Sequence, residues 1–259
     1  MIERTESNML LTNGCSFVWG DELEGFDHDP PTHQKHTFTH KLAKLLELPY
    51  ENLAKCGNGN DKIFRDVILR LNDVSLPVPT HMVILWSGWQ RMETANPTDR
   101  NQYAKGHIDV EDCMIQFSEE RSVYADEKSW GAITKYFNEF YDVRTSIMHQ
   151  LTYMISMQKL CDAMGIKLIQ GAFHARLLNN LSLVLDNDDE KWRPYNRKIS
   201  DMISQLRKTS RLGLGHWDDM YTMVKKNENF YLKPENHPCE GTHHEYAKLL
   251  HHIFTNIME

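Results

Sequence analysis

Cysteine is scarce in this chain of 259 residues, and long apolar runs are missing from it altogether. The five cysteines are odd in number and form no Cys-x-x-Cys pair, which indicates neither a disulfide framework nor a zinc ribbon. No stretch approaches the roughly 20 apolar residues of a membrane-spanning helix. The polar, acidic start, Met-Ile-Glu-Arg-Thr-Glu, is unlike a secretory signal. We therefore expect free thiols, a cytoplasmic location and no membrane partner.

An excess of positive charge is absent as well. The chain has 29 Lys and Arg against 36 Asp and Glu, which gives a formal net charge of −7. Such a chain has no overall basic field that would attract nucleic acid. Its 41% hydrophobic and 25% charged residues are typical of a globular protein. We therefore expect no nucleic-acid partner and one domain over residues 1–259.

Apolar strand patterns alternate with amphipathic helix patterns along the chain. Two polar stretches interrupt this alternation, and we interpret both as insertions, the first as a lid or substrate loop and the second with short helices. The alternation predicts an α/β fold, with three α/β/α layers around a mainly parallel, flavodoxin-like sheet. The predicted strands are 8–17, 50–54, 81–86, 166–172 and 230–232, the predicted helices 37–48, 63–71, 136–164 and 243–258, and the insertions 94–130 and 175–215.

A serine near the start and a histidine near the end of the chain are candidates for one reactive site. A serine hydroxyl is a weak nucleophile near neutral pH unless a base takes its proton. Ser16 ends a Gly-Cys-Ser turn, and His237 lies two residues after Glu235. Ser16 lies at the end of the first predicted strand, and Gly57 and Ser87 follow the next two; sites in parallel sheets lie beyond such strand ends. The pattern predicts an acyl-transfer site, and its alternative is a turn serine with a solvated loop carboxylate.

Four short motifs contain these residues. They are Gly-Cys-Ser ending at Ser16, Asn-Leu-Ala-Lys-Cys-Gly ending at Gly57, Ser-Gly-Trp-Gln starting at Ser87, and Glu-x-His-Pro with Glu235 and His237. In this order they resemble the four sequence blocks of the SGNH hydrolases, also called the GDSL esterase/lipase family. The first block has Cys where the family has Asp. The third lacks the family's Asn, and the last is one residue shorter than the usual Asp-x-x-His.

The resemblance implies a serine esterase that removes an acyl or acetyl group from a small-molecule or glycan ester through an acyl-enzyme, with no cofactor and no metal. Ser16 would be the nucleophile, His237 the general base and Glu235 the carboxylate that orients the imidazole. The backbone N–H groups of Ser16 and Gly57, with the hydroxyl of Ser87, would stabilise the oxyanion. The resemblance also implies a phage or bacterial source, and the host cytoplasm for a phage protein.

Residues around the end of the third predicted strand are candidates for substrate binding. Trp86 and Trp89 would stack on a sugar ring or line an acyl pocket, and Arg91 would face an anionic substrate. Gln90 is a second candidate donor to the oxyanion. The alternative places the tryptophans in the core and Arg91 on the surface.

Two other functions stay open. The departures at Cys15 and Ser87 fit a protein that keeps the fold but only binds a carbohydrate or another protein. Two groups of histidines suggest a metal-dependent hydrolase, with His36 and His40 on one helix face, although no His-Glu-x-x-His motif occurs. These groups are His28, Asp29, His33, His36 and His40, and His243, His244, His251 and His252.

Overall fold

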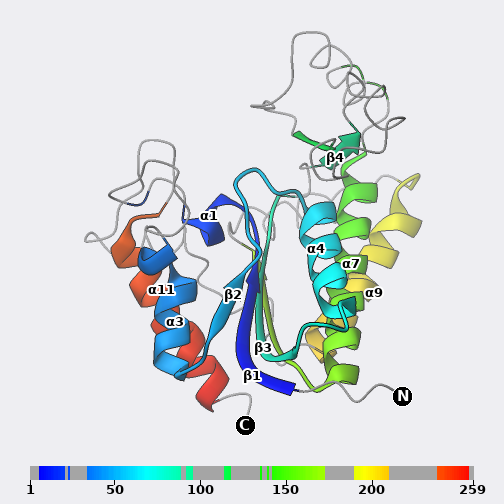
Figure 1. The fold of residues 1–259 in the computed structure, drawn as a ribbon. Coiled ribbons are helices and arrows are strands. Elements are labelled where there is room, and N and C mark those ends of the chain that lie inside the picture. Colours follow the sequence, from blue (N-terminus) through cyan, green and yellow to red (C-terminus); the bar gives the residue numbers. More distant parts are fainter. Residues whose placement is uncertain are drawn as a thin grey trace.

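The structure of this protein is a computed structural model that describes residues 6–20, 23, 34–88, 92–95, 114–117, 135, 139, 142–172, 190–209 and 238–256. Its centre is a sheet of four parallel strands in the order β2-β1-β3-β6 (Figure 1). This order is the one found in flavodoxin-like sheets. The strands are β1 (Glu6–Asn13), β2 (Tyr50–Asn52), β3 (Val78–Trp86) and β6 (Lys167–Ala172).

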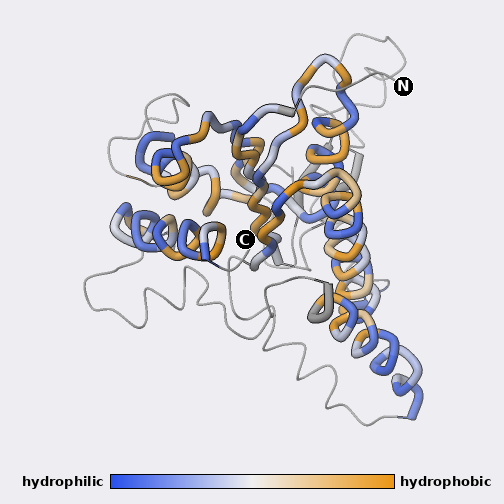
Figure 2. Tube along the Cα trace, turned by 90° about the horizontal axis from the view of Figure 1, so that it is seen from below, coloured by the Kyte–Doolittle hydropathy of each residue, from blue (hydrophilic) through white to orange (hydrophobic). Residues whose placement is uncertain are grey.

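Helices cover both faces of this sheet. Figure 2 shows the strands between the two helix layers, with hydrophilic and hydrophobic residues alternating along the helices. One layer contains α3 (Phe38–Leu46) and α11 (Glu240–Asn256), and the other contains α4 (Asn60–Asn72), α7 (Val143–Met164) and α9 (Arg193–Thr209). The predicted α/β/α architecture with a parallel sheet is therefore confirmed. None of the described helices is both long and apolar enough to cross a membrane.

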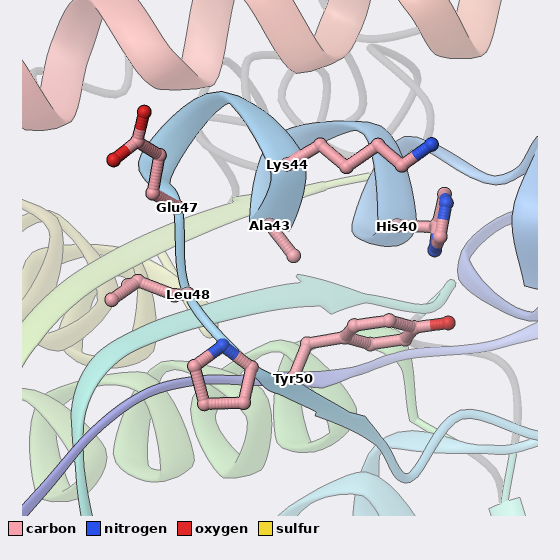
Figure 3. A pocket seen from close by; sticks show the side chains of 7 residues that line it. His40, Ala43, Lys44, Glu47, Leu48 and Tyr50 are labelled. Atoms are coloured by element: carbon pink, nitrogen blue, oxygen red, sulfur yellow. The ribbon is translucent and has the colours of Figure 1, made fainter.

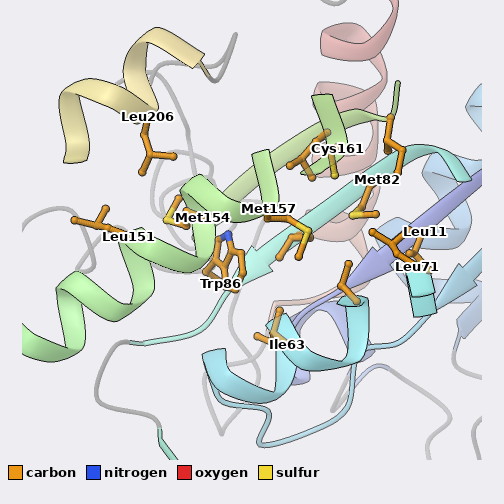
Figure 4. Close-up of a cluster of buried hydrophobic side chains, with 14 of the residues drawn as sticks. Leu11, Ile63, Leu71, Met82, Trp86, Leu151, Met154, Met157, Cys161 and Leu206 are labelled. Atoms are coloured by element: carbon orange, nitrogen blue, oxygen red, sulfur yellow. The ribbon is translucent and has the colours of Figure 1, made fainter. Parts of the chain in front are cut away.

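Successive strand residues supply two separate cores, because side chains alternate between the faces of a sheet. Leu11, Met82 and Trp86 pack with α4, α7 and α9, as Figure 4 shows. Leu10 and Val83, one residue away from two of these, pack with α3 and α11. Both faces of the sheet are buried, which is why the central strand β3 is a continuous apolar run.

Local capping determines where two of the helices begin. Thr37 caps α3, and its hydroxyl accepts a hydrogen bond from the His40 N–H at 3.4 Å. The predicted start at residue 37 is therefore nearly right. Asp142 caps α7, where its carboxylate accepts from the Arg144 N–H at 3.1 Å. That cap interrupts the helix predicted from residue 136. The helix ends at Met164, as predicted, and is capped by Gly165, which has a φ of 71°.

The two stretches predicted as insertions are described only in part. In the first, β4 (Met92–Ala95) pairs antiparallel with β5 (Met114–Phe117). In the second, residues 190–209 are described, and there one helix of 17 residues, α9, takes the place of the predicted short helices and packs on α7. Its buried Ile199 and Leu206 are seven residues apart and face the core, which is the spacing of one helix face. The strand predicted at 230–232 lies outside the described residues.

Two partly buried histidines make the stability depend on pH. Burial, and then the nearby Lys44, lower the pKa of His40, and burial and Lys167 lower the pKa of His81. Above a pH of about 6.5 both are neutral whether the chain is folded or unfolded. Below it, the unfolded chain binds protons that the folded chain resists, so the free energy of unfolding falls.

We therefore expect urea denaturation midpoints to decrease from pH 7 to pH 5. Each histidine contributes less than one proton, or less than about 1.4 kcal/mol per pH unit. Replacing both, as His40→Gln with His81→Gln, is expected to flatten this decline. A double variant with the same pH dependence as the wild type would assign the decline to other groups.

Candidate functional site

The carboxyl ends of β1 and β3 form the switch point of the sheet. These strands are neighbours, but β1 connects to β2 on one side, and β6 lies on the other side of β3. In open α/β sheets, ligands bind beyond the carboxyl ends of the strands at such a point. Ser16 and Ser87 each follow one of these two strand ends. The topology therefore brings together two residues that are 71 positions apart in sequence.

Ser16 lies in a sharp turn after β1. The strand ends at Asn13, whose side-chain oxygen accepts a hydrogen bond from the Gly14 N–H at 2.7 Å. The next element is the short helix α1 (Ser16–Trp19), whose first residue is Ser16. The predicted strand over residues 8–17 is therefore too long by four residues. Ser16 is 5% exposed and is therefore a buried residue.

The loop between β2 and α4 lies against both of these strand ends. Asn58 donates from its side-chain amide to the Gly14 carbonyl at 3.1 Å. Asn60 accepts from the Ser87 N–H at 2.8 Å and donates to the Ser87 carbonyl at 3.1 Å. Between β2 and these asparagines lies Gly57, with a φ of 79°, which favours glycine. Among the described residues, no acceptor is bonded to the Gly57 N–H, so it is a candidate oxyanion donor.

A second group of hydrogen bonds fastens α1 to β2. Asn52 donates to the Val18 carbonyl at 3.2 Å, and its side-chain oxygen accepts from Thr12 and from the Ala54 N–H, both at 3.1 Å. Thr12 also forms a hydroxyl contact of 3.2 Å with Thr39 in α3. The structural roles of Asn52, Asn58 and Asn60 were not predicted from the sequence. The clustering of asparagine and glycine after β2 is the available signal, and by itself it indicates only a turn.

Ser87 is fully buried at the end of β3. Its backbone N–H and carbonyl are both bonded to Asn60. Its hydroxyl has no hydrogen-bond partner in the described part of the chain. The expected role of this hydroxyl at the oxyanion stays a prediction.

Trp86 belongs to the core and does not occupy a substrate-binding position. It is fully buried, and its indole N–H donates to the side chain of Gln170 at 3.0 Å. Figure 4 shows it beside Leu151, Met154 and Met157 of α7. Trp86 is the last residue of β3 and points to the face that α7 covers, so its predicted contact with substrate is wrong.

Four predicted site residues lie outside the described part of the chain: His237, Glu235, Trp89 and Arg91. The description resumes at Pro238, which is buried, and α11 begins at Glu240. In Figure 1 the N-terminal end of α11 lies at the same end of the molecule as α1, where β1 and β3 end.

The start of α11 is held against α3 by long-range contacts. The His243 ring is buried, and its Nδ1 accepts a hydrogen bond from the Phe38 N–H at 3.1 Å. Glu240 accepts from Lys41 at 2.5 Å and lies 3.1 Å from the Nδ1 of His36. The Lys41 hydrogen bond helps to lower the pKa of Glu240, against the opposing effect of burial. These contacts join segments about 200 residues apart.

The described histidines near these helices do not gather into a metal centre. Within the described ranges, no group of three or more His, Cys, Asp or Glu side chains could hold a metal ion. His36 and His40 were predicted to share a helix face, but His36 belongs to the short helix η1 (Gln34–His36) and His40 to α3. His28 and His33 lie outside the described residues.

A separate hollow of about 480 Å³ runs along α3 at the outer edge of the sheet (Figure 3). In it the His40 ring meets the edge of the Tyr50 ring, with centroids 5.6 Å apart. Of the residues predicted for the serine site, none that the structure describes lines it. The lining residues are His40, Ala43, Lys44, Glu47, Leu48, Pro49 and Tyr50.

Comparisons with known proteins give a structural likeness at low identity. No family model and no curated protein sequence matches this chain. Its structural neighbours are SGNH hydrolases and acetylxylan esterases.

Three of these neighbours indicate the level of the likeness. A proposed SGNH hydrolase from Slackia heliotrinireducens is 11% identical, with a TM-score of 0.43 over 98% of this chain and 100% of that one. An acetyl xylan esterase from the rumen bacterium Butyrivibrio proteoclasticus is 12% identical, with a TM-score of 0.47 over 99% of this chain and 65% of that one. A catalytic mutant of an acetylxylan esterase from Geobacillus stearothermophilus is 13% identical, with a TM-score of 0.43 over 96% and 94%. These values are too low to transfer the role of any residue.

Proposed function

We propose that this chain is a serine esterase that hydrolyses an acyl or acetyl ester, carried by a carbohydrate, through an acyl-enzyme on Ser16. The observation that carries the proposal is the Asn58 hydrogen bond to the Gly14 carbonyl. It joins the turn of Ser16 to the loop of Gly57, so a candidate nucleophile and a candidate oxyanion donor belong to one bonded unit at the switch point of the sheet.

In the proposed reaction, the Ser16 Oγ attacks the ester carbonyl carbon while its proton passes to His237. The negative charge that develops on the carbonyl oxygen is stabilised by the backbone N–H groups of Ser16 and Gly57, and one such donor is commonly worth about 3 kcal/mol. The carbon–oxygen bond to the alcohol then breaks, and His237 gives the proton to the leaving oxygen. Water repeats the same steps on the acyl-enzyme and releases the acid. Glu235 would orient the imidazole.

The remaining expectations belong to the same proposal. Trp89 and Arg91 would contact the glycan or small-molecule substrate, and Ser87 would be a third donor. The chemistry needs no cofactor. We propose one domain over residues 1–259, with the segment at 94–130 shaping the choice of substrate.

Labelling with a fluorophosphonate, read by intact mass, tests this proposal. We expect one adduct on the wild type, mapped to Ser16, and none on Ser16→Ala or on His237→Ala. Ser200→Ala is the matched control, because Ser200 is an exposed serine on α9 and its loss is expected to leave the adduct in place.

Other outcomes would overturn the proposal. A folded wild type that takes no adduct would favour a binding protein with this fold. Ester hydrolysis that EDTA abolishes, without any adduct, would favour a metal-dependent hydrolase.

A further inference from the structure

We propose that Asn58 and Asn60 are positioning residues that set the Gly57 N–H relative to the Ser16 hydroxyl. This inference rests on the proposed function and adds two residues that act through the backbone. Both side chains are almost fully buried, with exposed fractions of 1% for Asn58 and 4% for Asn60. Both are bonded to backbone atoms of the turns that follow β1 and β3.

The strand ladder alone cannot position this loop. The last residues paired between β1 and β2 are Thr12 and Asn52, and the last residues paired between β1 and β3 are Asn13 and Ile84. Gly57 lies five residues beyond the end of β2. Past these pairs, the side-chain amides of Asn58 and Asn60 connect the loop to the neighbouring strand ends.

Each asparagine holds a different strand end. Asn58 reaches the Gly14 carbonyl, two residues before Ser16. Asn60 holds the turn after β3 through both of its amide atoms, and its NH₂ group also lies 3.4 Å from the Gly88 carbonyl. The loop after β2 is thereby connected to the end of β1 through Asn58 and to the end of β3 through Asn60.

A contact from α7 also holds the side chain of Asn60 in place. The Asn60 NH₂ group donates to the side-chain oxygen of Gln150 at 3.1 Å, and Gln150 is 4% exposed. The loop is therefore fixed to a 22-residue helix as well as to the sheet. A donor held in this way is already in place when the oxyanion forms, which is the condition for electrostatic stabilisation of a transition state.

The chemistry of the amide explains why asparagine is needed. A side-chain amide has a donor and an acceptor, and Asn60 uses both. A carboxylate at either position has no proton to donate at neutral pH. Asp at 58 would face the Gly14 carbonyl oxygen, and Asp at 60 would face the carbonyl oxygens of Ser87 and Gly88. Repulsion between these oxygens would move the loop while changing the side-chain volume very little.

Steady-state kinetics of the Asn58→Asp and Asn60→Asp variants on an acetyl ester tests the inference. We expect kcat to fall by about 30- to 100-fold in each, because a displacement of about 1 Å at a catalytic group costs on the order of 10²-fold. KM is expected to change less than about threefold, since the substrate contacts are kept. The pH at which kcat is half-maximal is expected to stay in place, because the base is unchanged. The fluorophosphonate labelling rate is expected to fall in parallel with kcat.

Two further variants separate positioning from stability. Gln158→Ala removes another buried amide from α7, one that donates to Asp162 at 2.9 Å, so it is expected to lower the melting temperature and leave kcat unchanged. Asn58→Ala removes the donor without adding charge, and it keeps the test decisive where the aspartate variant does not fold.

The outcomes distinguish the two proposals. Wild-type labelling at Ser16 together with a kcat within twofold of wild type in folded Asn58→Asp and Asn58→Ala would overturn the positioning role alone. A wild type that neither labels nor hydrolyses esters would overturn the proposed function and this inference with it.

Discussion

The Ser16→Ala variant is expected to hydrolyse an acetyl ester with a kcat lower by on the order of 10³-fold or more. The hydroxyl is the only group lost, and without it no acyl-enzyme can form at this position. Hydrolysis of a chromogenic acetyl ester measures kcat, and differential scanning calorimetry verifies that the variant is folded.

The double variant Ser16→Ala with His237→Ala tests whether these two residues act together. A nucleophile and its base act as one unit, so removing both is expected to cost little more than removing either one. Losses that multiply would mean that the two residues act separately. A Ser16→Ala enzyme that retains more than about a tenth of wild-type kcat would place the nucleophile elsewhere.

The Gly14→Ala variant is expected to lose about 3 kcal/mol of unfolding free energy, at the upper end of the range for overpacked cores. A methyl group on Gly14 would overlap the Cγ2 atom of Val18 and lie 2.9 Å from the Leu85 carbonyl oxygen. Val18 is fully buried and β-branched, so it has little freedom to turn away. Urea denaturation measures the loss.

Two other glycines provide matched controls for this variant. Gly171→Ala brings its methyl group to 3.2 Å from a Leu85 side-chain carbon and is expected to cost less. Gly165→Ala has nothing within 4 Å but a φ of 71°, so it measures only the strain of a left-handed backbone, about 1 to 2 kcal/mol. Adding Val18→Ala to Gly14→Ala is expected to recover part of the loss. If Gly14→Ala were as stable as Gly171→Ala, close packing at this turn would not be the reason for glycine.

The docking of α11 on α3 brings a segment from the first part of the chain together with one from its last part. Phe38 and His243 are 205 residues apart, and the buried imidazole accepts the backbone N–H at the start of α3. That N–H is one of the groups that a helix leaves without an intrahelical partner. The segment with His237 therefore precedes a helix that is fixed to the half of the fold that contains Ser16. This arrangement is consistent with the proposed pairing of the two residues.

The fold class was predictable because it depends on local patterns. The continuous apolar run of β3 indicated a sheet that is buried on both faces, and Leu10 and Leu11 do enter opposite cores. Thr37 and Gly165 marked helix ends through their capping chemistry, which involves only neighbouring residues. Patterns of this kind need no knowledge of distant parts of the chain.

Errors arose where a distant partner decides the outcome. The first strand was predicted to continue to Phe17, but it ends at Asn13, and the carbonyl of the next residue, Gly14, is bonded to Asn58, which is 44 positions away. Trp86 was predicted to face a substrate, but α7 covers it and Gln170 satisfies its indole N–H. Neither partner can be recognised from the residues around these positions.

By itself, the sequence determined the α/β/α architecture, because strand periodicity and helix caps are short-range properties. Its four short motifs, through their resemblance to the SGNH blocks, supplied the candidates Ser16 and Gly57. Only the tertiary structure decided that the loop of Gly57 is bonded to the turn of Ser16 and to the end of β3. Asn58 and Asn60 make those connections across 44 and 27 positions of the chain, respectively. A side-chain amide can bond to any backbone group that folding brings within reach, so its partner is decided by the packing of the strands rather than by its neighbours in the sequence.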